Sequence, residues 1–127
     1  MARKKIIDNT EQIVEAVIQG IQEKKGTSTV VLNMKEIHNS LWDYFIICDA
    51  SSSTQAEAIA DSVREFVKKQ TTENVYQKEG FENAQWILLD YVSVVVHIFQ
   101  RQYREFYNLE NLWADAKTTL IKDPNIK

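Results

Sequence analysis

The 127-residue sequence predicts a single α/β (α+β) domain, with about three helices packed on a five-stranded mixed sheet. A chain of this length fits one domain of ordinary size. Segments with helical and strand periodicity follow one another in the order α-β-β-α-β-β-β-α, which favours a sheet with helices packed against it. Three of the expected strands are apolar on both faces, which is typical of central strands covered on both sides.

The first half of the chain predicts two helices and two strands. The first helix is indicated by apolar residues at helical spacing: Ile13, Val14, Val17, Ile18 and Ile21. β-branched residues predict a strand over Thr29–Met34, and the short apolar run Tyr44–Cys48 predicts a buried strand. An apolar stripe predicts the second helix over residues 54–70, and Thr54 with Glu57 forms a capping box at its start.

The second half predicts three further strands and a third helix. Val75–Lys78 is expected to form a short, polar strand. The apolar runs Trp86–Asp90 and Val94–Phe99 are separated by a short connection, which predicts a hairpin. Gln100–Tyr107 is expected to be helical, and a further turn or two follows at Leu109–Trp113.

The domain is therefore expected over residues 1–113, followed by a flexible C-terminal tail over residues 114–127. Two long helices and a short one are too few to cover both faces of a five-stranded sheet. Part of one face is expected to stay uncovered, and an exposed apolar patch on a soluble protein usually marks an interaction site.

Composition and cysteine usage predict a soluble cytoplasmic protein with no membrane partner. Hydrophobic residues make up 44% and charged residues 26% of the chain, and the single cysteine excludes a disulfide scaffold. No apolar run approaches the ~20 residues of a membrane helix, and the basic N-terminus lacks the apolar segment of a signal peptide. The absence of an Arg- and Ser-rich presequence favours a bacterial source.

The charge distribution disfavours direct, sequence-specific binding of nucleic acid. The net charge is −3, and residues 26–100 carry five basic against ten acidic side chains. A nucleic-acid binder concentrates Lys and Arg on one face, because neutralising phosphates supplies much of its affinity. An acidic body instead favours a basic protein partner, and the alternative is a solvated acidic surface with no partner.

No catalytic, cofactor or metal site is predicted. Cys48 has no basic neighbour in the sequence to activate its thiol, so a buried structural role is expected. His97, within an apolar strand, is expected to be a hydrogen-bonded structural residue, with a role at an interface as the alternative. Asp43, Asp49 and Asp90 lie at strand ends, but the D-x-D pair that would hold Mg²⁺ for nucleotidyl transfer is missing.

A series of motifs runs along most of the chain. In the first half it is Asp43-x-x-Ile46-Ile47-Cys48, then Ser52, then Ile59-Ala60-Asp61-x-Val63. In the second half it is Glu79-Gly80-x5-Trp86-Ile87-x-x-Asp90, then Val94-x-Val96-His97-x-Phe99, then Arg104-x-x-Tyr107-x-Leu109-Glu110-x-Leu112-Trp113. In order and spacing, over about residues 10–113, the series resembles the ribosomal silencing factor family, also called RsfS or Iojap-like.

This resemblance implies a non-catalytic protein that binds the large ribosomal subunit through the universal ribosomal protein numbered fourteen. Bound there, it would block association with the small subunit and repress translation under nutrient limitation. The resemblance also implies a nucleotidyltransferase-like topology without the catalytic carboxylates, and it leaves room for a homodimer when the protein is free. The acidic central block suits a basic ribosomal protein as the target.

Two other classes of function remain open at this point. A nucleotide-handling enzyme on the same scaffold would need Asp43, Asp49 or Asp90 to converge on Mg²⁺. A plain homodimerisation or scaffold domain would need no site of its own.

The predicted partner-binding residues are Trp86, Phe81, Glu79, Glu82 and Asp90. Trp86 opens an apolar strand directly after an acidic loop. We expect its indole to be at least partly exposed and to anchor the ribosomal protein, with Phe81 adding apolar area. The three acids are expected to face basic side chains and to speed association. The alternative is that Trp86 is a core residue.

Three residues depart from the pattern of the family that the sequence resembles. The family usually has Gly where this chain has Ala50, so a tight anion-binding loop is not expected there. The family usually has Gly near Val92, so the geometry of the hairpin is expected to differ. Trp42 replaces a smaller residue and is expected to enlarge either the core or the contact surface.

Overall fold

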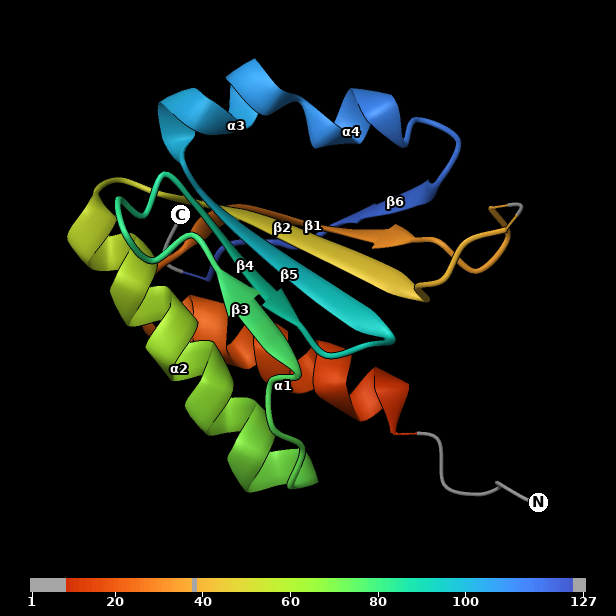
Figure 1. The fold of residues 1–127 in the computed structure, drawn as a ribbon, viewed down its shortest axis with the longest axis horizontal. Helices are drawn as coiled ribbons and strands as arrows, with labels where there is room; N and C mark the ends of the chain where they lie inside the picture. The colour runs from red at the N-terminus through yellow and green to blue at the C-terminus, as the bar shows by residue number, and fades with distance from the viewer. Residues whose placement is uncertain (1–8, 38, 125–127) are drawn as a thin grey trace.

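The helices and strands of the computed structural model follow the expected order, with one strand more than expected (Figure 1). The structure describes residues 9–37 and 39–124. Its elements are α1 (Thr10–Glu23), β1 (Thr27–Asn33), β2 (Tyr44–Ala50), α2 (Ser53–Thr71), β3 (Gln77–Glu79), β4 (Trp86–Asp90), β5 (Val94–Gln100), α3 (Arg101–Tyr107), α4 (Leu109–Leu112) and β6 (Lys117–Leu120).

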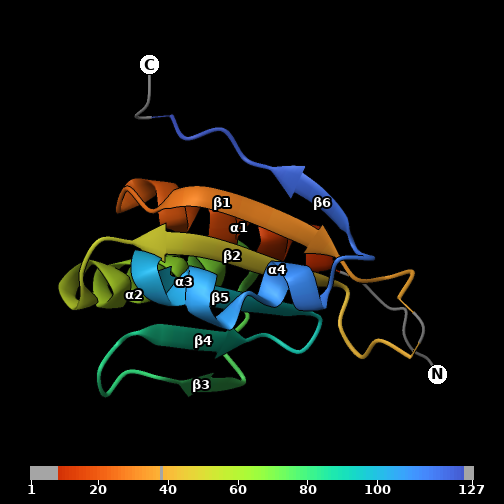
Figure 2. The same ribbon diagram turned by 90° about the horizontal axis from the view of Figure 1, so that it is seen from above.

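A mixed sheet in the strand order β3-β4-β5-β2-β1-β6 forms the centre of the fold (Figures 1 and 2). β2 and β5 pair in parallel, and all other neighbours are antiparallel. The predicted hairpin of β4 and β5 is confirmed, with Trp86 opposite Phe99 and Leu88 opposite His97. The α+β class and the mixed sheet are confirmed, but the sheet has six strands rather than five.

The sixth strand lies in the stretch that the sequence predicts to be a flexible tail. Lys117–Leu120 pairs antiparallel with β1, and all four of its residues are exposed. Backbone hydrogen bonds rather than side-chain burial hold this edge strand, so its sequence has no alternation of apolar and polar residues to reveal it. The folded domain therefore extends beyond Trp113, and residues 125–127 of the expected tail lie outside the described residues.

The second helix begins earlier than the capping box predicts. Ser52, whose backbone is extended, is the N-cap and accepts a hydrogen bond from the Gln55 backbone N–H at 3.1 Å. The Gln55 side chain in turn accepts from the Ser51 N–H at 2.6 Å. Ser52 thus takes the capping role expected of Thr54, because Thr54 already lies within the first turn, and the Gln55 side chain bonds the residue before the cap rather than the cap itself.

Two helices pack closely together on one face of the sheet. A Cβ atom at Gly20 of α1 would lie 2.7 Å from the Cα of Val63 in α2, so only glycine allows this approach. The Ser62 hydroxyl donates a hydrogen bond to the Gly20 carbonyl at 2.8 Å and ties the two helices together. Within the described part of the chain, no helix has both the length and the apolar character needed to cross a membrane.

The sheet separates two hydrophobic cores (Figure 1). The first core lies between the sheet and the α1–α2 pair. The second core lies beneath α3 and α4 and consists of Val30, Leu32, Met34, Phe45, Ile47, Val95, Phe99 and Ala116. No residue of α3 or α4 is itself buried. The two short helices lie over β2 and β5, and β4 and β3 extend beyond them (Figure 2).

Candidate partner-binding surface

Trp86 lies at the start of β4, on the sheet face that carries α3 and α4. Its half-buried indole stacks on Phe99, with 5.0 Å between the ring centroids, and contacts Tyr107 at 4.8 Å. Alternation along β4 places Leu88 on the same face, also half-buried, while the residue between them is buried in the first core. The partial exposure predicted for Trp86 is confirmed, and its role as an anchor stays a prediction.

The indole nitrogen of Trp86 is hydrogen-bonded to the imidazole of His97. Nε1 donates to Nδ1 at 3.1 Å, which confirms the expected hydrogen-bonded histidine. His97 is only 3% exposed, and this burial lowers the pKa of its ring to about 3. The ring is therefore neutral near pH 7. Its second nitrogen, Nε2, is buried and has no hydrogen-bond partner among the described residues.

Two aromatic residues of α3 enlarge the apolar area beside Trp86. Tyr107 is 43% exposed and Phe106 is 77% exposed, and their rings meet edge to face at 5.1 Å. We call Trp86, Leu88, Phe106 and Tyr107 the aromatic surface. The sequence reasoning did not assign Phe106 or Tyr107 to a site. The outward side of a seven-residue helix without buried residues cannot be identified from periodicity, although Tyr107 belongs to one of the motifs.

The prediction that Phe81 adds apolar area around Trp86 is wrong. Phe81 packs against the first core, on the α1–α2 side of the sheet, with the Lys78 ammonium 5.5 Å from its ring centroid. Gly80 causes this separation. Its φ of +90° turns the chain sharply, and a Cβ at this position would lie 2.0 Å from the Trp86 carbonyl oxygen. Phe81 and Trp86 consequently pack on opposite faces of the sheet.

The three predicted acids do not surround Trp86 as one ring. Glu79 is exposed at the end of β3 and pairs with Leu88, so it shares the face of the aromatic surface. Glu82 is exposed in the loop that leads to Trp86. Asp90 lies four residues further along β4, about 13 Å away at the usual rise per residue. Its carboxylate accepts a hydrogen bond from the Val92 N–H at 2.7 Å and stabilises the turn.

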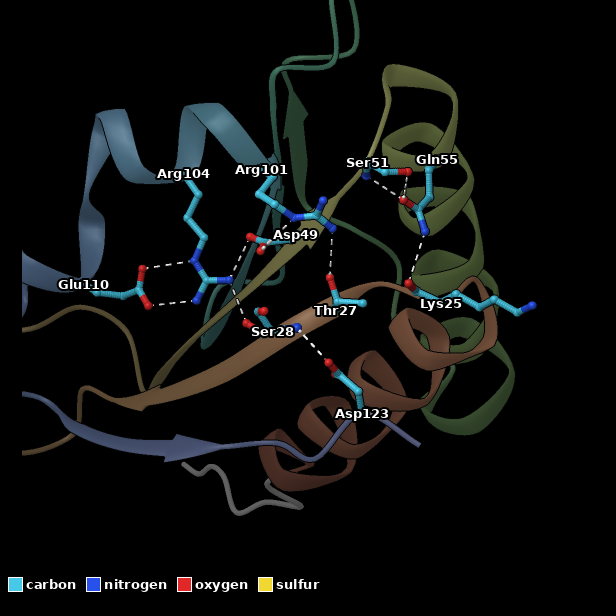
Figure 3. A network of polar contacts seen from close by, with 10 residues as sticks. All are labelled: Lys25, Thr27, Ser28, Asp49, Ser51, Gln55, Arg101, Arg104, Glu110 and Asp123. Atoms are coloured by element: carbon cyan, nitrogen blue, oxygen red, sulfur yellow. Dashed lines mark hydrogen bonds and ion pairs between the residues drawn. The ribbon is translucent and has the colours of Figure 1, made fainter. Parts of the chain in front are cut away.

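Arg104 fastens α3 and α4 to the sheet through three neighbours (Figure 3). Its guanidinium contacts Asp49 on β2 at 2.9 Å and forms a two-pronged pair with Glu110 on α4 at 2.8 and 3.1 Å. It also donates to the Ser28 carbonyl on β1 at 2.6 Å. Burial alone would lower the pKa of Arg104, but hydrogen bonds to Glu110 and Asp49 raise it above its usual value.

The position of Asp49 in this network also bears on the alternative function, a nucleotide-handling enzyme that would need aspartates to converge on Mg²⁺. Asp49 is held by Arg104 and lies 3.8 Å from Arg101, and Asp43 lies before the opposite end of β2, about 20 Å away along the strand. These two carboxylates cannot share a two-metal site, whose ions are only about 4 Å apart. No group of three His, Cys, Asp or Glu side chains in the described ranges is placed to hold a metal ion.

Cys48 has the structural role expected from the sequence. It is fully buried in the first core, and burial raises the pKa of its thiol well above the usual value. A thiol in this environment is not activated as a nucleophile. Trp42 is half-buried and packs against Phe45 and Trp113 at the margin of the second core, so it enlarges the core.

These features define a small α+β domain with one sheet face closed by two long helices and the other closed only in part, beside an aromatic surface. Residues 7–127 match the family model described as "Ribosomal silencing factor during starvation". The chain belongs to the ribosomal silencing factor family, as the motif series indicated.

Relatives with this name cover most of the chain. A ribosomal silencing factor, RsfS, of Halalkalibacterium halodurans is 37% identical over 114 residues, which is 90% of this chain and 96% of that protein. RsfS of Bacillus subtilis is 40% identical over 111 residues, covering 85% of this chain and 90% of that protein. A crystal structure of a Bacillus halodurans protein has a TM-score of 0.75 at 36% identity, over 87% of this chain and 99% of that one. The two RsfS relatives carry the name of a regulatory factor rather than of an enzyme.

Proposed function

We propose that this protein binds the large ribosomal subunit through the basic universal ribosomal protein numbered fourteen. Bound there, it blocks association with the small subunit and represses translation when nutrients are limiting. Membership of the ribosomal silencing factor family is the observation that carries the proposal. The relatives named above are from bacteria, and we propose a bacterial cytoplasm as the location of this protein.

The aromatic surface is the proposed contact with the ribosomal protein. Trp86 supplies an aromatic anchor of the kind in which interfaces concentrate binding energy, and Phe106 and Tyr107 add exposed apolar area. Glu79 and Glu82 lie on the side of the surface formed by β3 and its loop. Their negative charges suit a basic partner and favour rapid, oriented association.

Sedimentation of purified ribosomal subunits with the added protein tests this function. We expect the wild-type protein to migrate with the large subunit and to lower the fraction of joined ribosomes. Trp86→Ala should weaken binding at least ~30-fold, which corresponds to the usual ~2 kcal/mol of a hot-spot residue. Its melting temperature should fall only moderately, because the half-buried indole stacks on Phe99 and bonds to His97, whereas loss of a fully buried tryptophan costs about 3–5 kcal/mol of folding free energy.

Tyr76→Ala is the matched control. Tyr76 is 73% exposed but directly precedes β3, where alternation places it on the other face from Glu79. Its removal should leave both sedimentation and subunit joining unchanged. Failure of the wild-type protein to migrate with the large subunit, or to reduce joining, would contradict the proposed function.

A further inference from the structure

His97 is buried with only one of its two ring nitrogens in a hydrogen bond. Nδ1 accepts from the Trp86 indole, whereas Nε2 has no partner within the part of the chain that the structure describes. Because an indole nitrogen can only donate, Nδ1 is unprotonated and Nε2 carries the proton. An apolar side chain of similar size would fill the same place without leaving a buried N–H unpaired. The imidazole therefore has a role beyond packing.

The ring contacts of Trp86 do not fix the orientation of the indole within its own plane. Phe99 stacks on the indole at an interplanar angle of 27°, and Tyr107 contacts it at 47°. Contacts of this kind define the plane of an indole better than its orientation within that plane. His97 lies diagonally across from Trp86 on the neighbouring strand, since Leu88 is directly opposite His97. The hydrogen bond to Nδ1 selects the orientation in which the N–H edge is turned toward β5.

We propose that His97 is a positioning residue for partner binding, whose Nδ1 holds the Trp86 indole in the orientation that meets the basic ribosomal protein. The inference rests on the proposed function. Trp86 is half-buried, so without His97 its N–H can turn outward and bond to water instead. An anchor that is already oriented in the free protein loses less conformational freedom on binding. The neutral state of the buried ring keeps the acceptor available near pH 7.

Three substitutions at His97 separate positioning from packing. His97→Asn keeps an acceptor close to the place of Nδ1. His97→Gln puts its amide close to the place of Nε2, and His97→Leu has no acceptor at all. Two properties are measured for each variant. One is the hydrogen exchange of the Trp86 indole N–H, followed by NMR with ¹⁵N-tryptophan and assigned with Trp86→Phe. The other is the affinity for purified large ribosomal subunits.

We expect slow exchange of the Trp86 indole N–H in the wild-type protein and in His97→Asn, and fast exchange in the other two variants. Affinity for the large subunit should fall about tenfold in His97→Leu and His97→Gln and stay within about twofold in His97→Asn. The melting temperature of His97→Leu should equal or exceed that of the wild-type protein, because the unpaired buried N–H is removed.

Unchanged affinity in His97→Leu together with fast indole exchange overturns the inference, as does equal weakening by the Asn and Leu variants. If His97→Leu does not fold, equal affinities of the Asn and Gln variants for the large subunit would likewise overturn the inference. If the wild-type protein does not bind the large subunit, the proposed function fails and this inference fails with it. If only the His97 variants behave otherwise than expected, the proposed function stands.

Discussion

Val92 has a backbone conformation that suits it poorly. In the turn between β4 and β5 its φ is +76°, a region that β-branched residues rarely adopt. The side chain is 59% exposed, so little packing depends on it. We expect Val92→Gly to raise the free energy of unfolding by about 1 kcal/mol through relief of this strain.

Denaturant unfolding of the wild-type protein, Val92→Gly and Val92→Ala measures this effect. Val92→Ala keeps a Cβ atom at the same positive φ and should gain less than the glycine variant. A glycine variant that is less stable than the wild-type protein would contradict the prediction.

Single residues also show where sequence reasoning about the site succeeds and where it stops. The partial exposure of Trp86 is expected mainly from the resemblance to the family, because periodicity does not decide which way the first residue of a strand faces. The position of Phe81 could not be predicted, because the turn at Gly80 decides which face of the sheet the following loop reaches. The pairing of Trp86 with His97 depends on the register between β4 and β5, which the hairpin pattern does not specify.

At the scale of elements, one side chain ties α3 and α4 to the strands beneath them. Neither helix has a fully buried residue, although Tyr103 and Leu109 pack against the second core, and the guanidinium of Arg104 joins the helices to β1 and β2. Arg104→Met should leave the buried Asp49 carboxylate without its closest partner and lower the free energy of unfolding by about 3 kcal/mol. Amide hydrogen exchange should rise most over residues 101–113.

Arg101→Met is the control for this prediction. The Arg101 side chain is 62% exposed and lies 3.8 Å from Asp49, so its loss should change stability by less than about 1 kcal/mol. Equal effects of the two substitutions would show that the buried contacts of Arg104 do not hold the helices.

At the scale of the whole molecule, the distribution of charge predicts how salt affects binding. The chain has 18 acidic and 15 basic residues, and its proposed partner is basic. Raising NaCl from about 50 to about 300 mM shortens the Debye length from roughly 14 to roughly 6 Å. The association rate with the large subunit should therefore fall several-fold, while the dissociation rate changes little.

Stopped-flow measurements at several salt concentrations record both rates. A Glu79→Gln, Glu82→Gln double variant should associate more slowly and depend less on salt. The same two changes at Glu57 and Glu65, which are exposed on α2, serve as the control for net charge. Association that does not depend on salt would contradict an electrostatic contribution.

The overall architecture could be predicted where periodicity was strong. Apolar runs identified β2, β4 and β5, and the helical stripes identified α1 and α2. The position of β6 could not be predicted, because an exposed strand at the edge of a sheet leaves no pattern of burial in its sequence. The parallel pairing of β2 with β5 likewise depends on contacts between distant segments rather than on local sequence.

The place of β6 has a consequence for how the sheet is completed during synthesis. Its Leu120 pairs with Val30, ninety positions earlier, and β1 borders β6 along one edge. A growing chain folds from its N-terminal part first, so β1 emerges from the ribosome long before the strand that covers it. Throughout that interval, β1 presents free backbone groups to any other nascent chain nearby. The sheet acquires its final border only when almost the whole of this sequence has been translated.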